Sequence, residues 1–289
     1  MKRLETTVGE RIASAMQELS PSGRRVARKL LSEYPVAGLD TVASLAIGAG
    51  VSGPTVFRFV KTLGFESFRD FQSALRSEVG ARHESNLSQT VRTVTEGQEE
   101  TRSALQEVRE AQIRGIEHTY AMVRDTEIEH VAELLANRKR KILTFGGAFS
   151  NILATHLLTQ LSPMRPGIQT LPSNTVAAAA ILEDLGRMDV AVIFDFRRYD
   201  AVSEKRARIA RDHGAIVILV TDRWLSPVAA SADHVLTVDV VASGPSDTLV
   251  PALALLEAVC ELVTNSLGRS AVDRLGRVDP IRVALQAQN

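Results

Sequence analysis

Residues 42–61 read VASLAIGAGVSGPTVFRFVK, and their apolar residues fit two short helices that meet across a tight turn. Val42, Leu45 and Ala46 form one helical face, and Val51, Val56, Phe59 and Val60 form another. Gly48 and Gly50 lie between them, where a left-handed turn is least unfavourable for glycine. This pattern is typical of a helix-turn-helix, whose second helix enters the major groove of DNA. The alternative is an ordinary helical hairpin in a protein core.

The start of the second helix also has the expected residues. Ser52 stands at the N-cap, and Pro54 falls in the first turn, where no intrahelical donor is lost. The first residues of such a helix contact DNA, and further contacts follow one and two turns on. The predicted DNA-binding residues are therefore Ser52, Pro54, Thr55, Arg58 and Lys61.

Helical spacing on both sides of this segment predicts an all-α head over residues 1–80. We expect helices over 8–18 and 21–33 before the helix-turn-helix, and a last helix after the cap residue Ser67. Leu63-Gly64-Phe65 is expected to end the second helix of the motif with a glycine C-cap. The head thus has five predicted helices. It contains eleven Lys or Arg and eight Asp or Glu, an excess that suffices for phosphate contacts if a dimer doubles it.

The composition excludes several classes of protein. An apolar content of 45% supports folded domains, and an aromatic content of 4% argues against binding single strands by base stacking. We expect no signal peptide and no membrane span, which places the protein in the cytoplasm. Cys260 is interpreted as a buried structural thiol. No metal-ligand spacing is seen, so no metal or cofactor is expected.

The second half of the chain alternates between apolar strands and helices. Residues 81–125 are polar and are expected to form a connecting helical linker that packs on another surface, such as a second subunit. Five continuously apolar strands then predict a doubly wound α/β domain with a parallel sheet over residues 126–289. They are expected at 142–145, 168–171, 190–194, 216–220 and 235–240.

A ligand site is expected where the strand order of such a sheet reverses. With a flavodoxin-like order, the loops after the first and third strands, 146–150 and 195–200, meet there. The first loop offers glycines at a helix start, and the second offers adjacent arginines that suit an anion. The predicted ligand-binding residues are Gly146, Gly147, Ser150, Asp195, Arg197, Arg198 and Tyr199. The alternatives are a tight turn, an Asp195–arginine pair that holds the loop, and a subunit contact.

These features together resemble the RpiR/MurR-type bacterial transcription regulators, which join a helix-turn-helix domain to a sugar isomerase (SIS) domain. The resemblance rests on the segments 51–59 and 63–65 in the head and on 145–150, 214–222, 226–227 and 232–233 in the second domain. It implies a cytoplasmic homodimer or higher homo-oligomer that binds double-stranded operator DNA and senses a small anionic metabolite, often a phosphosugar.

One loop departs from the family pattern. The usual third-strand loop reads S-x-S-G-x-T, whereas residues 195–200 read DFRRYD. We therefore hypothesise a different small anion, for example a sugar acid or another carboxylate metabolite.

Two other functions are weighed against the regulator. A sugar-phosphate isomerase needs a general base near the bound sugar. Four residues are candidates for this base: Glu183, His156, His213 and Glu257. None has a second catalytic residue at a spacing typical of an active site, so no catalytic residue is expected. A third reading is a dimerising module that binds no ligand.

Overall fold

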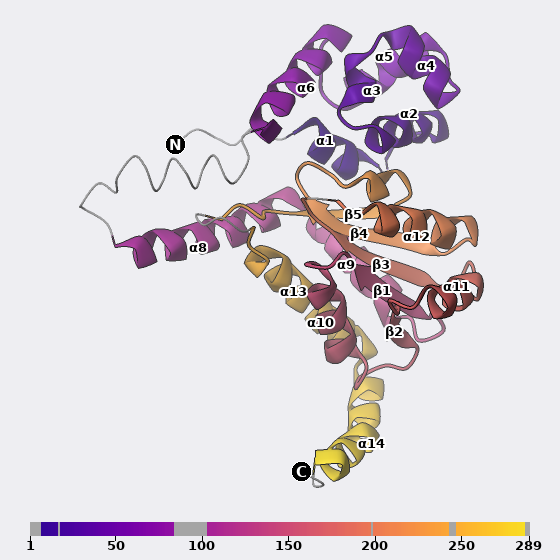
Figure 1. The fold of residues 1–289 in the computed structure, drawn as a ribbon, viewed down its shortest axis with the longest axis vertical. Helices are drawn as coiled ribbons and strands as arrows, with labels where there is room; N and C mark the ends of the chain where they lie inside the picture. Colours follow the sequence, from indigo (N-terminus) through magenta and orange to yellow (C-terminus); the bar gives the residue numbers. More distant parts are fainter. Residues whose placement is uncertain (1–6, 17, 84–102, 198, 243–246, 287–289) are drawn as a thin grey trace.

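The computed structural model describes residues 7–16, 18–83, 103–197, 199–242 and 247–286. The helices up to His83 form a helical head, and the helices and strands from Ala104 onward form an α/β body (Figure 1). The head contains α1 (Val8–Ala15), α2 (Pro21–Ser32), α3 (Val36–Leu39), α4 (Val42–Ala49), α5 (Gly53–Thr62) and α6 (Phe68–His83). The predicted fold class, an all-α head joined to a parallel α/β domain, is confirmed.

The head follows the predicted signals closely, with one difference. Ser20 caps α2 by accepting a hydrogen bond from the Gly23 N–H at 3.1 Å, and Pro21 is the first helical residue. Gly64 follows α5 with a φ of 84°, the left-handed conformation expected of a glycine C-cap. The expected number of five helices was wrong, because the single turn α3 lies between α2 and α4. Its four residues are too few for a helical period to show in the sequence.

The body is a five-stranded parallel sheet covered by helices on both faces. Its order, β2-β1-β3-β4-β5, is the predicted flavodoxin-like one. The strands are β1 (Ile142–Gly146), β2 (Ile168–Thr170), β3 (Val190–Asp195), β4 (Ile216–Asp222) and β5 (His234–Val238). The other elements are α8 (Ala104–Met122), α9 (Asp125–Ala136), α10 (Asn151–Leu161), α11 (Thr175–Glu183), α12 (Ala201–Asp212), the 3-10 helix η1 (Pro227–Ala230), α13 (Val250–Leu267) and α14 (Arg269–Gln286).

Two hydrophobic clusters lie on opposite faces of the sheet. One joins α9, α10 and α13 to the sheet, and the other joins α11 and α12 to the sheet and continues into the head.

Of the predicted linker, residues 84–102 lie outside the described residues, and α8 packs against α13 and β5 of the same chain. By length and composition alone, helix α13 is long and apolar enough to span a membrane. Its buried residues, including Leu255, Val259 and Val263, pack in the body, as expected of a core helix.

The head rests on the edge of the sheet that ends with β5 (Figure 1). Helix α1 contacts β5, and α2 packs on η1, which follows β4. The turn that follows β4 is therefore in contact with the head. The carboxyl end of β4, from which this turn leaves, is also on the side of the sheet where a ligand is expected.

Candidate DNA-reading helix and ligand pocket

Helices α4 and α5 are arranged as a helix-turn-helix. They are inclined at 97° to each other, within the range of about 90–120° found in this motif. Gly50 allows the turn, since its φ is 62° and its N–H donates to the Ile47 carbonyl at 3.1 Å. Val56, Phe59 and Val60 hold α5 on the head, with exposures of 0%, 2% and 1%. The opposite face of α5 is directed away from the core of the head.

Four of the five predicted DNA-binding residues lie on this outer face. Ser52, Pro54, Arg58 and Lys61 are exposed, whereas Thr55 is buried. The Thr55 hydroxyl lies 3.0 Å from the Ser52 hydroxyl and accepts a hydrogen bond from Arg58 at 3.4 Å. Ser52 is at the N-cap as predicted, but its hydroxyl contacts Thr55 and no backbone amide of the helix. Thr55 thus positions the exposed residues on either side of it.

Sequence reasoning missed Phe57, which lies on the same face of α5. Half of this residue is exposed, and its ring packs edge-on against Phe68 with 6.5 Å between the ring centroids. An apolar side chain on a DNA-reading helix can contact a thymine methyl group. The signal for it was available, since Phe57 falls between the two inward residues Val56 and Phe59.

A cavity of about 480 Å³ lies beyond the carboxyl ends of β1 and β3, which are neighbours in the sheet. Five of the seven predicted ligand-binding residues line it, namely Gly147, Ser150, Asp195, Arg197 and Tyr199. Gly146 lies behind it, where an added Cβ would come within 2.8 Å of the Phe194 carbonyl oxygen. Arg198 lies outside the described residues. Ala148, Phe149, Phe196 and Asp200, which belong to the two predicted loops, also line the cavity, as do Ala201 and Asp247, which lie outside those loops.

The loop after β1 offers hydrogen-bond donors to the cavity. The backbone N–H groups of Ala148 and Phe149 donate to no acceptor within the described residues. They precede α10, so the positive end of that helix faces the same space. The Ser150 hydroxyl is occupied, because it donates to the Phe194 carbonyl at 2.6 Å and ties the loop to β3. This side of the cavity suits an anionic group.

The cavity also contains a buried carboxyl group. Asp195 ends β3 and is 2% exposed. The Ser226 hydroxyl donates to its Oδ2 atom, and the Asp200 N–H donates to its Oδ1 atom at 3.2 Å. Burial raises the pKa of Asp195 to about 6, although these two hydrogen bonds oppose the shift. The group therefore exchanges a proton close to neutral pH.

The second loop is held by Asp222 at the end of β4, which sequence reasoning also missed. Its carboxylate accepts the Arg197 N–H at 2.7 Å, the Tyr199 hydroxyl at 2.9 Å and the Trp224 N–H at 2.8 Å. Burial raises the pKa of Asp222, and these hydrogen bonds counteract it. The Arg197 guanidinium lies 3.4 Å from Asp247. Asp222 thus holds this loop, and Arg197 pairs with Asp247; a pair of Asp195 with Arg198 lies outside the described residues.

The four candidate bases of an isomerase lie away from this cavity. His213 pairs with Glu183 at 3.1 Å, and His156 lies 3.6 Å from Glu257. None of the four lines the cavity. Among the residues that the structure describes, no three His, Cys, Asp or Glu side chains are grouped as a metal site requires.

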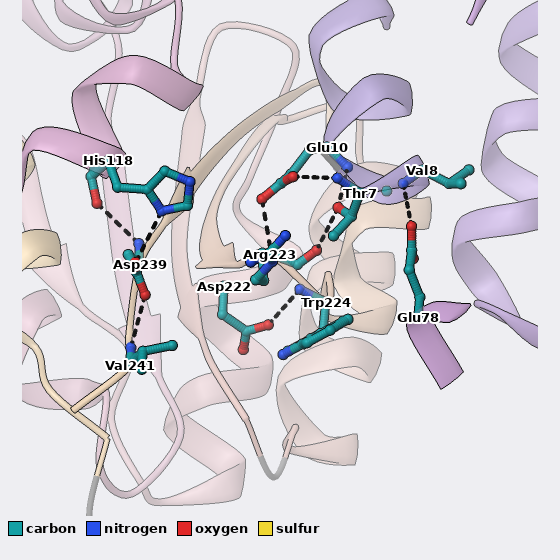
Figure 2. A network of polar contacts seen from close by, with 12 residues as sticks. Thr7, Val8, Glu10, Glu78, His118, Asp222, Arg223, Trp224, Asp239 and Val241 are labelled. Atoms are coloured by element: carbon teal, nitrogen blue, oxygen red, sulfur yellow. Dashed lines mark hydrogen bonds and ion pairs between the residues drawn. The ribbon is translucent and has the colours of Figure 1, made fainter. Parts of the chain in front are cut away.

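The residue after Asp222 makes one of the contacts between the head and the body (Figure 2). Figure 2 shows Arg223 extended toward Glu10 of α1, with its Nε atom 3.7 Å from Glu10 Oε1. The Arg223 carbonyl oxygen accepts a hydrogen bond from the Thr7 hydroxyl at 3.3 Å. Both oxygens of Glu78 bind the head internally, through the Val8 N–H and the Tyr34 hydroxyl. One turn therefore holds the ligand loop through Asp222 and the head through Arg223.

Comparison with known proteins agrees with this two-part architecture. Residues 6–82 match the helix-turn-helix domain of the rpiR family, and residues 134–262 match the SIS domain. Among curated proteins, the HTH-type transcriptional regulator HexR of Escherichia coli is 27% identical over 282 residues, which cover 93% of this chain and 92% of HexR.

Two solved structures share the fold. The sugar isomerase domain of an RpiR transcription factor from Sphaerobacter thermophilus superposes with a TM-score of 0.56 at 23% identity, covering 62% of this chain and 99% of that domain. The Vibrio vulnificus NanR protein, complexed with ManNAc-6P, has a TM-score of 0.53 at 16% identity, covering 96% of this chain and 99% of NanR.

Proposed function

The chain belongs to the RpiR family of transcriptional regulators with a helix-turn-helix and an SIS domain, and from this premise we propose that a metabolite bound by its body changes its affinity for operator DNA. The observation that supports this most directly is the turn 222–223, which binds the ligand loop on one side and the head on the other. As a DNA-binding regulator, the protein acts in the cytoplasm.

The DNA contact is assigned to the exposed face of α5. Arg58 is suited to a base edge, because a guanidinium can bind guanine with two hydrogen bonds. Ser52 and Lys61 are suited to phosphates, and Pro54 and Phe57 to apolar contacts with the groove. Two heads in a dimer would contact half-sites about 10 base pairs apart, or a multiple of that spacing.

The effector is a small polyhydroxylated metabolite with one anionic group. The anionic group binds at the Ala148 and Phe149 amides, where donors and the helix dipole converge. The carboxylates of Asp195, Asp200 and Asp247 also line the cavity and accept hydrogen bonds from hydroxyl groups. This division fits a sugar phosphate or a sugar acid. The NanR relative was solved with ManNAc-6P, which has both kinds of group.

The effector acts on the head through the turn after β4. A ligand that draws Arg197 or Tyr199 toward itself changes the hydrogen bonds that these residues donate to Asp222. The same turn holds Leu225 with a φ of 55°, a strained value for a residue with a branched side chain. Leu225 packs on α1, since a Cβ added at Gly9 would lie 2.9 Å from Leu225 Cδ1. A coupling of about 1–3 kcal/mol between the two sites is typical.

A second copy of the chain is part of the proposal. Helix α14 projects from the body (Figure 1) and has four arginines and two aspartates. Its exposed apolar residues are Val272, Leu275, Ile281, Val283 and Leu285. A groove of about 320 Å³ along α9 and α13 contains Asp125, Glu129 and Glu261 beside apolar residues. The arginines and apolar residues of α14 complement the acidic and apolar residues of this groove. Helix α14 of one copy therefore packs in the groove of the other copy.

One experiment tests the function as a whole. Binding of the full-length protein to the DNA upstream of its own gene is measured by fluorescence anisotropy, with and without a panel of sugar phosphates and sugar acids. We expect sequence-specific binding that at least one of these compounds shifts by about 5–150-fold. Specific binding that no compound of either class changes would contradict a metabolite sensor.

The alternative function is a sugar-phosphate isomerase, and one observation favours it. The Asp195 carboxyl lines the cavity, and its pKa of about 6 suits a general base. The hydrogen bonds that its oxygens accept from Ser226 and from the Asp200 N–H stabilise the ionised form, however, and so make it a weaker base. Incubating the protein with the effector and following isomerisation by NMR separates the two functions.

A further inference from the structure

A second cavity, of about 230 Å³, lies between the head and the body. Arg24 and Arg28 line it from α2 of the head, while Ile216, Asp233 and His234 line it at the amino ends of β4 and β5. This cavity thus lies at the amino ends of the strands, whereas the effector pocket lies at their carboxyl ends. The second cavity holds about eight water volumes of ~30 Å³ and is smaller than the roughly 300–1,000 Å³ of pockets for drug-sized ligands. A small ion fits this space better than a whole sugar does.

The cations at this cavity outnumber the acid that faces them. Asp233 Oδ1 lies 3.7 Å from Arg28 and 3.8 Å from Arg211, which approaches from α12 of the body. Both distances exceed the approximately 2.7–2.9 Å of a close charged hydrogen bond. The other oxygen of Asp233 accepts the Val217 N–H at 3.0 Å. Two guanidinium groups therefore share one carboxylate loosely, and Arg24 adds a third cation.

Arg28 also has a donor that is not used. Its Nε atom is buried and has no hydrogen-bond partner within the described residues. The pKa of Arg28 is lowered by burial and next by the positive charge of Arg211. An oxyanion in the cavity would supply the acceptor and offset the repulsion between the guanidinium groups.

We propose that this cavity binds a phosphate-sized oxyanion through Arg28 and Arg24 of the head, with Arg211 on the side of the body. The ligand is inorganic phosphate or the phosphate group of a small metabolite. By joining cations from both parts, it stabilises the head in its docked position on the body. This site is separate from the effector pocket, so it does not depend on the identity of the effector.

The test measures binding of inorganic phosphate to the full-length protein by isothermal titration calorimetry, with chloride matching the ionic strength. Arg28→Gln removes the buried donor and one charge and is expected to weaken phosphate binding about tenfold or more. Arg25→Gln is the matched control, because Arg25 is exposed on the same helix and the charge change is identical. It is expected to leave the affinity within about twofold, since exposed charges at a distance are screened.

Arg197→Ala is the second control and separates this cavity from the effector pocket. Phosphate affinity is expected to persist in this variant. Retained affinity in Arg28→Gln, loss of affinity in Arg197→Ala, or no binding by the wild type each overturns the proposal. If Arg28→Gln does not fold by circular dichroism, Arg24→Gln replaces it and must weaken phosphate binding. A parallel titration with glycerol phosphate identifies the source, because preference for it over inorganic phosphate indicates a metabolite.

Discussion

The Arg223 Nε atom of the body lies 3.7 Å from the Glu10 Oε1 atom of the head, and both atoms are buried. The pair is longer than a hydrogen bond, although the Glu10 side chain is held in place by the Thr7 N–H at 2.6 Å. Arg223 directly follows Asp222, which binds the ligand loop. This pair, one of several contacts between head and body, is thus a loose ion pair whose length can respond to the position of one turn.

Replacement of Arg223 by alanine is expected to weaken the head–body contact. It leaves the Glu10 carboxylate, which is 3% exposed, without this counter-charge, and should lower the free energy of unfolding by about 1–3 kcal/mol. Urea unfolding measures the change. Arg208→Ala removes an exposed ion pair with Glu204 and should change stability by less than about 0.5 kcal/mol. Equal effects of the two substitutions would show that the Glu10–Arg223 pair stabilises the protein no more than an exposed ion pair does.

Arg197→Ala is expected to abolish the effector response while DNA binding persists. The side chain lines the cavity and lies near Asp247, far from α5 in the sequence and in a different part of the molecule. Fluorescence anisotropy with operator DNA, with and without effector, measures both properties. Arg208→Ala, on α12 outside the cavity lining and paired with Glu204, is the control. An intact response in Arg197→Ala would place the effector site elsewhere.

Asp195 predicts a pH dependence of stability. Its pKa is raised in the folded protein to about 6 from an unfolded value near 3.9, so the folded state binds more protons between these values. The contribution of Asp195 to the free energy of unfolding is therefore greatest below about pH 4. It falls by on the order of 2–3 kcal/mol as the pH rises to about 6. Asp195→Asn should lose this contribution, giving a shallower fall in urea-unfolding free energy between pH 4 and 7. Parallel pH profiles for the two proteins would contradict it.

Arg58→Ala is expected to weaken specific operator binding by about 1–3 kcal/mol if the side chain contacts a base. Lys61→Ala, one turn further along α5, should weaken binding to all sequences and lower the salt dependence by about one unit of slope. Titrations at fixed salt and across a salt series measure these effects. A binding curve for Arg58→Ala that coincides with that of the wild type would remove this residue from the interface.

Local signals in the sequence predicted most of the fold. Signals that depend only on neighbouring residues were reliable. Three of them lie as expected: the cap at Ser20, the left-handed turn at Gly50 and the glycine after α5, Gly64. The strand order was also predicted, because apolar strands alternating with helices restrict the topology to few arrangements. The position of the cavity then followed from that order.

Features that depend on contacts distant in the sequence were not predicted. Asp222 holds Tyr199, 23 residues earlier in the chain, through a hydrogen bond that no spacing reveals. Thr55 was expected to face DNA, yet it is buried, because side chains three residues apart on a helix share a face and Ser52 and Arg58 close over it. The Glu10–Arg223 pair depends on how the head docks on β5, which no local pattern in either part specifies.

Helix α14 provides the test of the oligomer. Ile281 and Leu285 are 61% and 72% exposed and lie four residues apart, so they share one face of the helix. A charge on this face, as in Leu285→Glu, is expected to shift the protein to a smaller assembly in size-exclusion chromatography with light scattering. Gln286→Glu adds the same charge one residue later, on another side of the helix, and should leave the mass unchanged. Because Leu285 is 72% exposed in its own chain, the circular dichroism spectrum of the variant should match that of the wild type. An unchanged mass in Leu285→Glu would mean that α14 is not the surface that binds the second copy.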